Sequence, residues 1–505
     1  MSLIGLDVGT SGCKAALFSE TGQMLVAAYE EYDTLHPQPG WAELDAQEVW
    51  GKVRHSLQRV AAYPGASTDP VKALAVSSLG EATVPVSHDR QMLGPSILNF
   101  DSRGREYLPA LQARLGNQRL YRINGNMLGS NYGLTKLMWI KERQPELYER
   151  AYKFLNWGCF VSFILGAEPV IDYSLANRLL LFDLERRDWL TELLAWSGLD
   201  RDKLPATAPS GTVIGRLEAR LAGELGLPAG LAIVSGAHDQ CANAVGCGGI
   251  QEGYPMYGMG TFLCAVPVFS QPRPAAAMIE RGLNTEHHAV AGRYVSFIYN
   301  QGGSLLKWYR DTFAAVERRR AAAERRDIYA ELIAEIPSEP SRVMALPHFS
   351  ITGPPQFIDD SSGVLAGLTL ETSRAEILKG ILEGATFYVR QVLETLPGVG
   401  IPIDGYRAVG GGSKSDAWLQ LSADILGKPL VRAVVSEAGA LGAAIIAGSG
   451  AGVFSSIEEG CQAMVRLGQE FEPDARRQSQ YDRRFEKYQK LWPLMAGYLR
   501  ELAEG

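Results

Sequence analysis

The N-terminal segment joins an apolar strand to a loop of glycines and hydroxyl residues, and this junction restricts the fold more than any other part of the chain. Residues 3–24 read LIGLDVGTSGCKAALFSETGQM, so one carboxylate, Asp7, is carried to the end of the strand. Glycines let a backbone turn tightly and present its N–H groups to an anion, and carboxylate oxygens are ligands that Mg²⁺ prefers. The segment therefore predicts a site for magnesium and phosphate.

The kind of phosphate loop follows from two motifs that this segment lacks. It contains neither the GxxxxGK[ST] pattern of a P-loop nor the GxGxxG pattern of a dinucleotide fold. Thr10, Ser11 and Lys14 add hydroxyl donors and one positive charge. The apolar run then continues past the turn sequence Thr21-Gly22. We therefore expect a nucleotide-binding β-hairpin.

Length and charge limit the class of protein. The chain has 505 residues, which is too long for one ordinary core, and 46% of them are hydrophobic while 21% are charged. The formal net charge of −7 argues against nucleic acid or an anionic membrane as the main partner. We expect a globular α/β protein of two large domains, and the sequence leaves open whether it forms a homodimer.

Cysteine usage indicates a reducing compartment. The six cysteines are scattered without CxxC pairs, so neither a zinc site nor a disulfide framework is predicted. The N-terminus has no charged-then-apolar signal segment, and the apolar stretch at residues 438–447 is too short and too rich in glycine to span a bilayer. These features predict a cytoplasmic protein.

The chain reads as two halves with related beginnings. The first half predicts strands near residues 3–8, 14–18, 24–31 and 73–77, with a helix after Asp45. Around residue 231 the pattern restarts, because a buried-strand sequence, LAIVS, leads into GAHDQ and an alanine-rich helix. We therefore expect a first domain over residues 1–235 and a second over residues 236–505.

A glycine cluster late in the chain predicts a binding surface for a flat ligand. A strand at residues 406–409 is followed by GGGSKSD and by a helix at 417–426. Glycines after a strand allow a ligand to approach the backbone, and a helix N-terminus points N–H donors toward it. We expect Asp416 to be the N-cap of that helix, with an adenine or ribose bound beside it.

Asp239 is the candidate general base. It lies at a strand-to-helix turn, where a carboxylate can accept a proton from a substrate hydroxyl as the hydroxyl oxygen attacks a phosphate. Because Asp is also common at helix starts, an N-cap is the alternative role. The neighbouring His238 is given a supporting role, since a lone His is more often packed or hydrogen-bonded.

Further polar residues follow strands of the first half and could bind a polyol. Glu81 follows the strand at 73–77, while Asp101 and Arg103 follow a later one. Carboxylates suit this task because they accept hydrogen bonds from neighbouring hydroxyls, and an arginine can hold a carboxylate in place or donate to the sugar. The alternative for Asp101 and Arg103 is an ordinary surface ion pair.

Over nearly its whole length the chain resembles the FGGY family of carbohydrate kinases, which includes glycerol kinase and xylulokinase. The motifs that carry the resemblance are LDVGTSGCKAALF at 6–18, PGWAELDAQEVW at 39–50, FDSR at 100–103, GAHDQ at 236–240, GMGTF at 258–262, GGS at 302–304, GGGSKSDAWLQLSADILGKP at 410–429 and ALGAA at 440–444. The resemblance implies two ribonuclease-H-like domains of the actin and Hsp70 type, with sugar bound mainly by the first and ATP with Mg²⁺ mainly by the second.

The resemblance also implies roles for individual residues. Asp7 and Asp239 would hold Mg²⁺, and Asp239 would be the base. The sugar would contact Glu81, Asp101, Arg103 and Gln240. The phosphates and adenosine would contact Thr10, Ser11, Lys14, Gly260, Thr261, Gly303, Lys307, Gly411, Gly412 and Asp416. A glycerol-kinase-like register would instead put Met259 in the place of a phosphate-binding threonine, and we prefer Thr261, as in xylulokinase-like members.

Departures from the family pattern leave the substrate open. Leu79-Gly80-Glu81 replaces the Met-His-Gly segment of xylulokinases and puts glycine in the first place of the Arg-Glu pair of glycerol kinases. The choice between a ketose and a sugar alcohol stays open. The rival hypothesis is an actin- or Hsp70-like ATPase that acts on a protein partner. Such an ATPase would not need Glu81, Asp101, Arg103 and Asp239 together at strand ends, so we favour the kinase.

Overall fold

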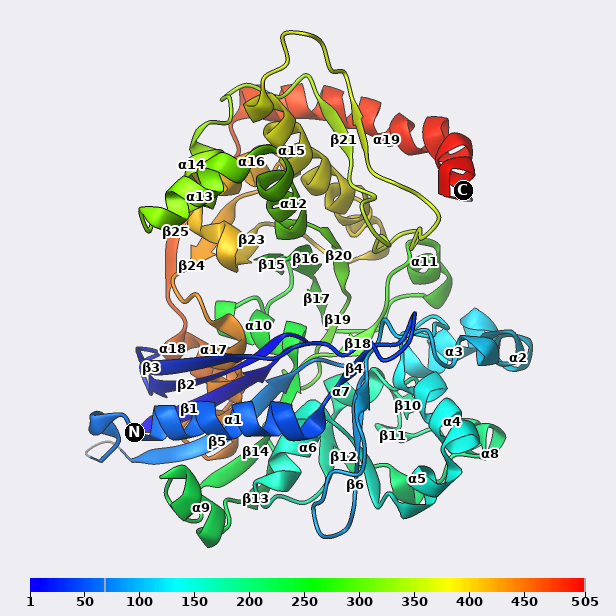
Figure 1. Ribbon diagram of the computed structural model, residues 1–505, viewed down its shortest axis with the longest axis vertical. Coiled ribbons are helices and arrows are strands. Elements are labelled where there is room, and N and C mark those ends of the chain that lie inside the picture. Colours follow the sequence, from blue (N-terminus) through cyan, green and yellow to red (C-terminus); the bar gives the residue numbers. More distant parts are fainter. Residues whose placement is uncertain (68–69, 504–505) are drawn as a thin grey trace.

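The computed structural model describes residues 1–67 and 70–503 and contains two six-stranded sheets, one in each half of the molecule (Figure 1). Within the described ranges, no helix combines the length and the apolar character needed to cross a membrane. The first sheet has the order β13-β14-β5-β1-β2-β3, with bounds Val213–Arg216, Ala232–His238, Val71–Ser78, Ser2–Val8, Gly12–Ser19 and Met24–Glu31. The second has the order β20-β16-β15-β23-β24-β25, with bounds Ile298–Gln301, Phe262–Val266, Met256–Met259, Tyr406–Val409, Leu430–Ala433 and Leu467–Phe471.

The two sheets repeat one topology. In the first, β1, β2 and β3 form an antiparallel meander, β5 and β14 add parallel strands beside β1, and β13 closes the edge antiparallel to β14. In the second, β15, β16 and β20 form the meander, β23 and β24 are the parallel strands, and β25 closes the edge. The N-terminal hairpin expected from the sequence is confirmed, with Asp7 paired to Lys14 across β1 and β2.

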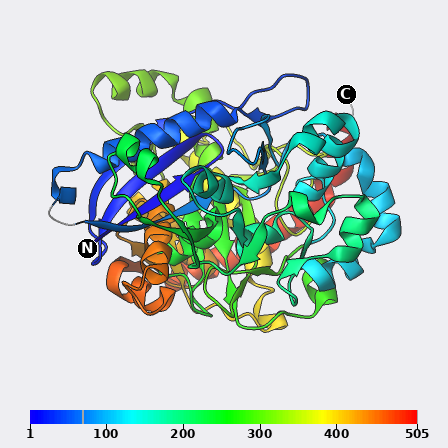
Figure 2. The ribbon, with the colours of Figure 1, turned by 90° about the horizontal axis from the view of Figure 1, so that it is seen from below.

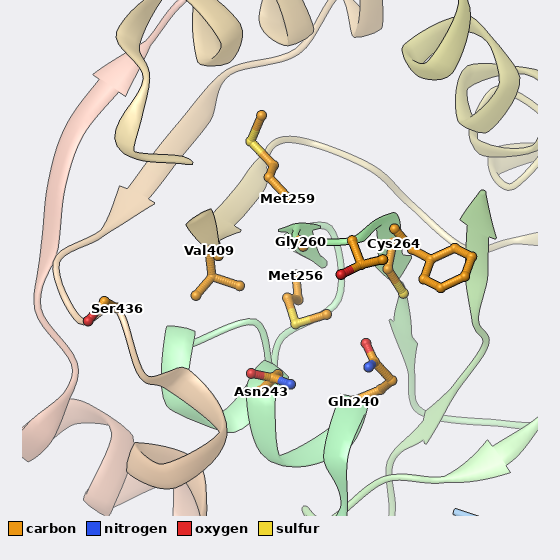
Figure 3. Close-up of a pocket in the computed structure, with 12 residues that line it drawn as sticks. Gln240, Asn243, Met256, Met259, Gly260, Cys264, Val409 and Ser436 are labelled. Carbon is orange, nitrogen blue, oxygen red and sulfur yellow. The ribbon is translucent and has the colours of Figure 1, made fainter. Parts of the chain in front are cut away.

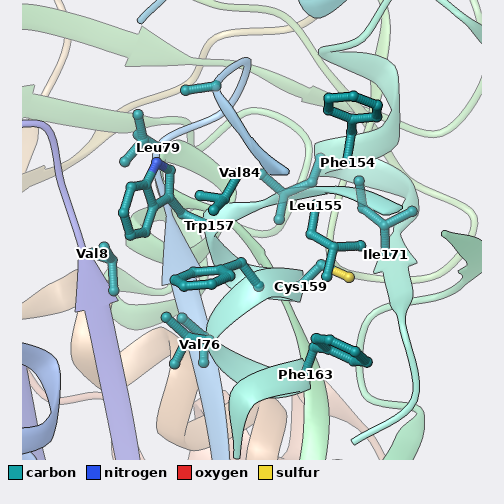
Figure 4. Close-up of a cluster of buried hydrophobic side chains, with 14 of the residues drawn as sticks. Val8, Val76, Leu79, Val84, Phe154, Leu155, Trp157, Cys159, Phe163 and Ile171 are labelled. Carbon is teal, nitrogen blue, oxygen red and sulfur yellow. The ribbon is translucent and has the colours of Figure 1, made fainter. Parts of the chain in front are cut away.

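Both faces of the first sheet are buried. Alternate residues of β1 point to opposite sides of the sheet, and each side packs against its own apolar core. Ile4, Leu6 and Val8 belong to one apolar core with α1 (Ala46–Ala61), whereas Leu3 belongs to another with α17 (Ala438–Gly450). Seen from below, α1 and α17 lie on opposite faces of this sheet (Figure 2). A further part of the core gathers Val8 and Val76 around Trp157 of α6, Trp157–Ile164 (Figure 4).

The junction between the halves is a contact of α17 with α10 (Asp239–Cys247) and β1, and glycines make it close. A Cβ at Gly442 would lie 1.9 Å from the carbonyl oxygen of Ala242, and a Cβ at Gly5 would lie 1.7 Å from that of Ala440. No side chain fits at these positions. The contact therefore fixes a helix from the second half of the sequence against the first sheet.

The predicted boundary between residues 235 and 236 falls inside β14. Ala237 and His238 still pair with Ser77 and Ser78 of β5, so the whole strand belongs to the first sheet. The sequence showed the restart at this strand, but it did not show which sheet the strand joins.

The glycine at position 442 gives the first test. Gly442→Ala should lower the free energy of unfolding by about 1–3 kcal/mol, because overpacking forces α10 and α17 apart. Gly51→Ala is the matched control, since Gly51 lies within α1 with open space around it, and it should stabilise the chain by about 0.5–1 kcal/mol. Scanning calorimetry of both variants makes the comparison, and equal transition temperatures for the two would contradict the close contact.

Candidate functional site

Asp7 lies at the end of β1 beneath the start of α17. Its Oδ1 accepts a hydrogen bond of 2.7 Å from the Ser77 hydroxyl on the neighbouring strand, and a Cβ at Gly439 would lie 2.8 Å from its Oδ2. Burial raises the pKa of this carboxyl, while the Ser77 hydrogen bond and the charge of Lys14 oppose the rise. One carboxylate is thus held at the mouth of the hairpin loop.

The hairpin loop presents Thr10 and Ser11 beside Asp7. The Gly9 N–H donates to the Gly12 carbonyl at 2.9 Å, and the Tyr32 hydroxyl donates to the Gly9 carbonyl at 2.7 Å, which closes the turn. Ser11 is exposed and Thr10 is half-buried. Lys14 pairs with Glu437, the residue that precedes α17, so this cation lies between the hairpin and the second half.

Asp239 is the first residue of α10 and directly follows β14. Its Oδ1 is buried and has no hydrogen-bond partner among the described residues, although His238 Nε2 lies 3.2 Å away without hydrogen-bond geometry. Burial and then the charges of Asp7 and Glu81 raise the pKa of Asp239 to about 7. The N-cap position of α10 is His238, so the alternative role of Asp239 as an N-cap is not the one the structure shows.

His238 packs rather than titrates. Its ring meets Phe297 edge-on at 5.1 Å, and burial, with Arg178 nearby, holds its pKa well below the ordinary histidine value. Its imidazole is therefore neutral at physiological pH, which fits the supporting role expected from the sequence.

A cavity of about 280 Å³ lies between α10 and the turn that joins β15 to β16 (Figure 3). Gln240 and Asn243 of α10 lie at its lower side, and Gly260, Thr261 and Gly410 contribute to its lining. The cavity thus combines residues that follow strands of both sheets.

The turn between β15 and β16 distinguishes the two registers of the phosphate loop. Met259 contributes to the lining but is only 1% exposed, whereas Gly260 and Thr261 are exposed at the cavity edge (Figure 3). The start of α12 (Gly303–Phe313) is tied to this turn, because the Gly303 N–H donates to the Gly260 carbonyl at 2.9 Å. Lys307, one helical turn further on, is exposed. The geometry favours Thr261 over Met259 as the phosphate contact.

The late glycine cluster borders the same cavity, with one correction. Gly410 has φ +97°, and a Cβ there would lie 3.0 Å from the carbonyl group of Met259, while Gly411 has open space where a side chain would be. The N-cap of α16 (Asp416–Leu426) is Ser415, not Asp416 as the sequence predicted. Asp416 is the first helical residue, and its carboxylate pairs with Arg432. The helix expected after the glycines is present, but its capping group lies one residue earlier than predicted.

Glu81 belongs to a buried ion pair whose partners the sequence did not reveal. Arg178 pairs with Glu81 and also, through Nη1, with Glu286 Oε1 at 2.5 Å. Asn284 Nδ2 donates to the same Glu286 oxygen at 2.7 Å. No motif marks Arg178 or Glu286, because their meeting depends on the packing of segments far apart in the chain.

Asp101 and Arg103 are buried, so the alternative of an ordinary surface pair does not hold. The Asp101 carboxylate accepts from Arg103 Nη2 at 2.6 Å and from the Ala42 N–H at 2.6 Å, and its side chain has no exposed area. Arg103 also pairs with Glu43 at 2.6 Å and stacks over Trp41 at 3.9 Å. Because both groups are already partnered within the protein, they fix the loop rather than present free atoms to a ligand.

Two ribonuclease-H-like domains around a cavity lined with glycines define the class of actin-like kinases and ATPases. Within that class, the chain belongs to the FGGY family of carbohydrate kinases, whose N-terminal domain matches residues 2–246 and whose C-terminal domain matches residues 259–451. The resemblance stated from the sequence motifs is thereby confirmed.

Individual relatives match over almost the full length. The chain is 28% identical to a xylulose kinase of Escherichia coli (strain K12), with 98% of this chain and 100% of the relative covered. It is 29% identical to a glycerol kinase of Solidesulfovibrio magneticus, with 94% of each covered. The crystal structure of a xylulose kinase from Brucella ovis superposes with a TM-score of 0.87 at 25% identity, covering 99% of this chain and 100% of that one. The expected two-domain fold is confirmed.

The register of the phosphate loop can be tested by nucleotide binding. Thr261→Val should weaken ADP binding by about 10- to 100-fold, because a hydrogen bond to a charged phosphate contributes about 1.5–3 kcal/mol. Met259→Leu, which keeps the buried volume, should change the affinity little. Titration calorimetry with ADP gives both values, and a larger loss in the Met259 variant would restore the other register.

Proposed function

We propose that this protein transfers the γ-phosphate of ATP to a hydroxyl of a small sugar or polyol. The observation that carries the proposal is the buried, unpartnered Oδ1 of Asp239, a residue that feels the charge of Asp7 and directly precedes Gln240 of the cavity lining. Family membership and relatives that are named as xylulose and glycerol kinases support the same reaction.

Asp239 acts as the general base. The substrate hydroxyl gives its proton to the Asp239 carboxylate while its oxygen forms a bond to the γ-phosphorus, and the bond from that phosphorus to the β-phosphate oxygen breaks to release ADP. A pKa of about 7 suits this role, because a carboxylate with that pKa is a stronger base than an ordinary aspartate and is still substantially ionised near neutral pH.

Asp7 and Asp239 are the residues that would hold Mg²⁺. Among the described residues there is no cluster of three or more His, Cys, Asp or Glu suited to a metal, but Mg²⁺ in phosphoryl-transfer sites needs one or two carboxylates together with the phosphates. The free oxygen of Asp239 fits that need. The ion, when bound, neutralises charge on the phosphate oxygens.

The remaining roles belong to the same proposal. Gly260, Thr261, Gly303, Gly411 and Gly412 border the nucleotide, with Thr10, Ser11, Lys14, Lys307 and Asp416 nearby. Glu81 and Gln240 contact the sugar, and Asp101 with Arg103 positions the wall behind it. The rival ATPase that drives a protein partner has no support in the comparisons. The six cysteines are free and buried, in keeping with a cytoplasmic protein.

The direct test is ADP release from ATP and Mg²⁺ across ketoses, aldoses, sugar acids and polyols, with a control that lacks any acceptor. Stimulation by one or a few compounds is expected, because the acceptor hydroxyl displaces water as the nucleophile. Release that no compound raises above the control would favour the ATPase.

Asp239→Asn should lower kcat by about 10²–10⁴-fold, because the amide cannot accept the proton. Nucleotide affinity should stay within about threefold, since the glycine loops are untouched. Asp359→Asn, a change at an exposed loop aspartate, is the control and should leave both values unaltered. Steady-state kinetics with ADP titration measures both quantities, and turnover near the wild-type rate in Asp239→Asn would refute the assignment.

A further inference from the structure

Arg178 fills the place that a side chain at position 80 would take. A Cβ added to Gly80 would lie 3.0 Å from Arg178 Cγ and 3.1 Å from His238 Nε2. A side chain at position 80 would therefore crowd Arg178 and His238. Glu81 still has an arginine partner, but the partner comes from 97 residues further along the chain.

The backbone around Arg178 is fixed at several points. Arg178 follows α7 (Tyr173–Asn177), whose N-cap Asp172 accepts from the Leu175 N–H at 3.1 Å. The His238 N–H donates to Ser174 Oγ at 2.9 Å, and the His287 N–H donates to Asn177 Oδ1 at 3.0 Å. These bonds tie α7 both to the strand that precedes Asp239 and to β18 (Glu286–His287) of the second half.

The Arg178 guanidinium is enclosed by carboxylates and rings. It pairs with Glu81 and Glu286, and its Cζ lies 5.1 Å from the ring centre of Tyr132 and 5.7 Å from that of Phe297. The side chain keeps 12% of its surface exposed. These contacts hold the guanidinium in one orientation. A fixed orientation is required if a side chain is to discriminate between ligands by their shape.

Four buried polar atoms around this arginine have no hydrogen-bond partner among the described residues. They are Arg178 Nε, His238 Nδ1, Asp239 Oδ1 and Glu286 Oε2. Buried polar atoms are nearly always paired in folded proteins, so a group of unpaired ones indicates a missing polar ligand. The set contains both donors and acceptors, which matches hydroxyl groups because a hydroxyl can do either.

The charge of this cluster selects against an anionic sugar. Arg178 supplies one positive charge, and it is already shared by two carboxylates, Glu81 and Glu286. A substrate carboxylate placed here would meet an excess of negative charge, and like-charge contacts are unfavourable in a buried site. Neutral hydroxyls carry no such penalty.

We propose that Arg178, held between Glu81 and Glu286, is a specificity-determining residue that orients an uncharged polyol or ketose, while the two carboxylates around it reject sugar acids. The inference rests on the proposed function and adds the substrate class and the residue that sets it. Glu286 orients the guanidinium from the second half of the chain and keeps the site negative.

The test compares each alditol with the aldonic acid of the same carbon skeleton in wild type, Arg178→Lys and Glu286→Gln. Arg119→Lys is the matched control, since Arg119 forms an exposed pair with Glu192. Wild type should favour the neutral compound by about 100-fold or more in kcat/KM. Arg178→Lys should raise the KM for the neutral compound by about tenfold or more, because lysine cannot bridge both carboxylates. Its kcat and its affinity for ADP should change less. Glu286→Gln should shrink the neutral-to-acid ratio by about tenfold.

Each failure has a distinct reading. If Arg178→Lys turns over the neutral compound with an unchanged KM, the role of Arg178 is overturned. A wild-type preference for the acids would overturn the substrate class. The proposed function would survive either result. If Arg178→Lys fails to fold, Glu286→Gln decides, and an unchanged ratio there overturns the inference. No turnover with any neutral or acidic compound would overturn the proposed function and this inference together.

Discussion

The contact of α17 with α10 and β1 is the constraint on which the site depends. Carbonyl oxygens of one element lie where side chains of another would be, so Gly5 and Gly442 permit an approach that any larger residue prevents. This contact brings the start of α17 over Asp7 and places α10, with Asp239 at its first position, beside the second sheet. Gln240, which directly follows Asp239, and the glycine loops of the second sheet thus line one cavity.

Burial and neighbouring charges then set the pKa of Asp239, the candidate base. The pKa of Asp239 rises because burial, and then the charges of Asp7 and Glu81, disfavour its ionisation. Two ion pairs lie at the edges of this set, Lys14 with Glu437 beside the hairpin loop and Arg178 with Glu286 beside Glu81. Both pairs join the two halves of the chain. A site built in this way stays polar and buried, which suits the exclusion of water during phosphoryl transfer.

Local sequence patterns predicted the elements that depend on residues close together in the chain. The hairpin, the strand-terminal Asp7 and Asp239 and the glycine turns follow from residues within a few positions of each other, and the structure has them. The N-cap of α16 was misplaced by one residue, because Ser415 and Asp416 are both suitable caps and only the backbone distinguishes them. Arg178 and Glu286 were missed because a contact across 108 residues leaves no local signal. Burial of Asp101 and Arg103 depends on Trp41 and Glu43, and a motif does not show it.

The most direct measurement of the central claim is phosphorus NMR of a reaction containing the protein, ATP, Mg²⁺ and the neutral acceptor that best stimulates ADP release. The account predicts a phosphomonoester resonance that grows in step with ADP, with little inorganic phosphate, because Asp239 directs the substrate hydroxyl rather than water at the γ-phosphorus. Growth of inorganic phosphate alone, with no phosphomonoester, would contradict it.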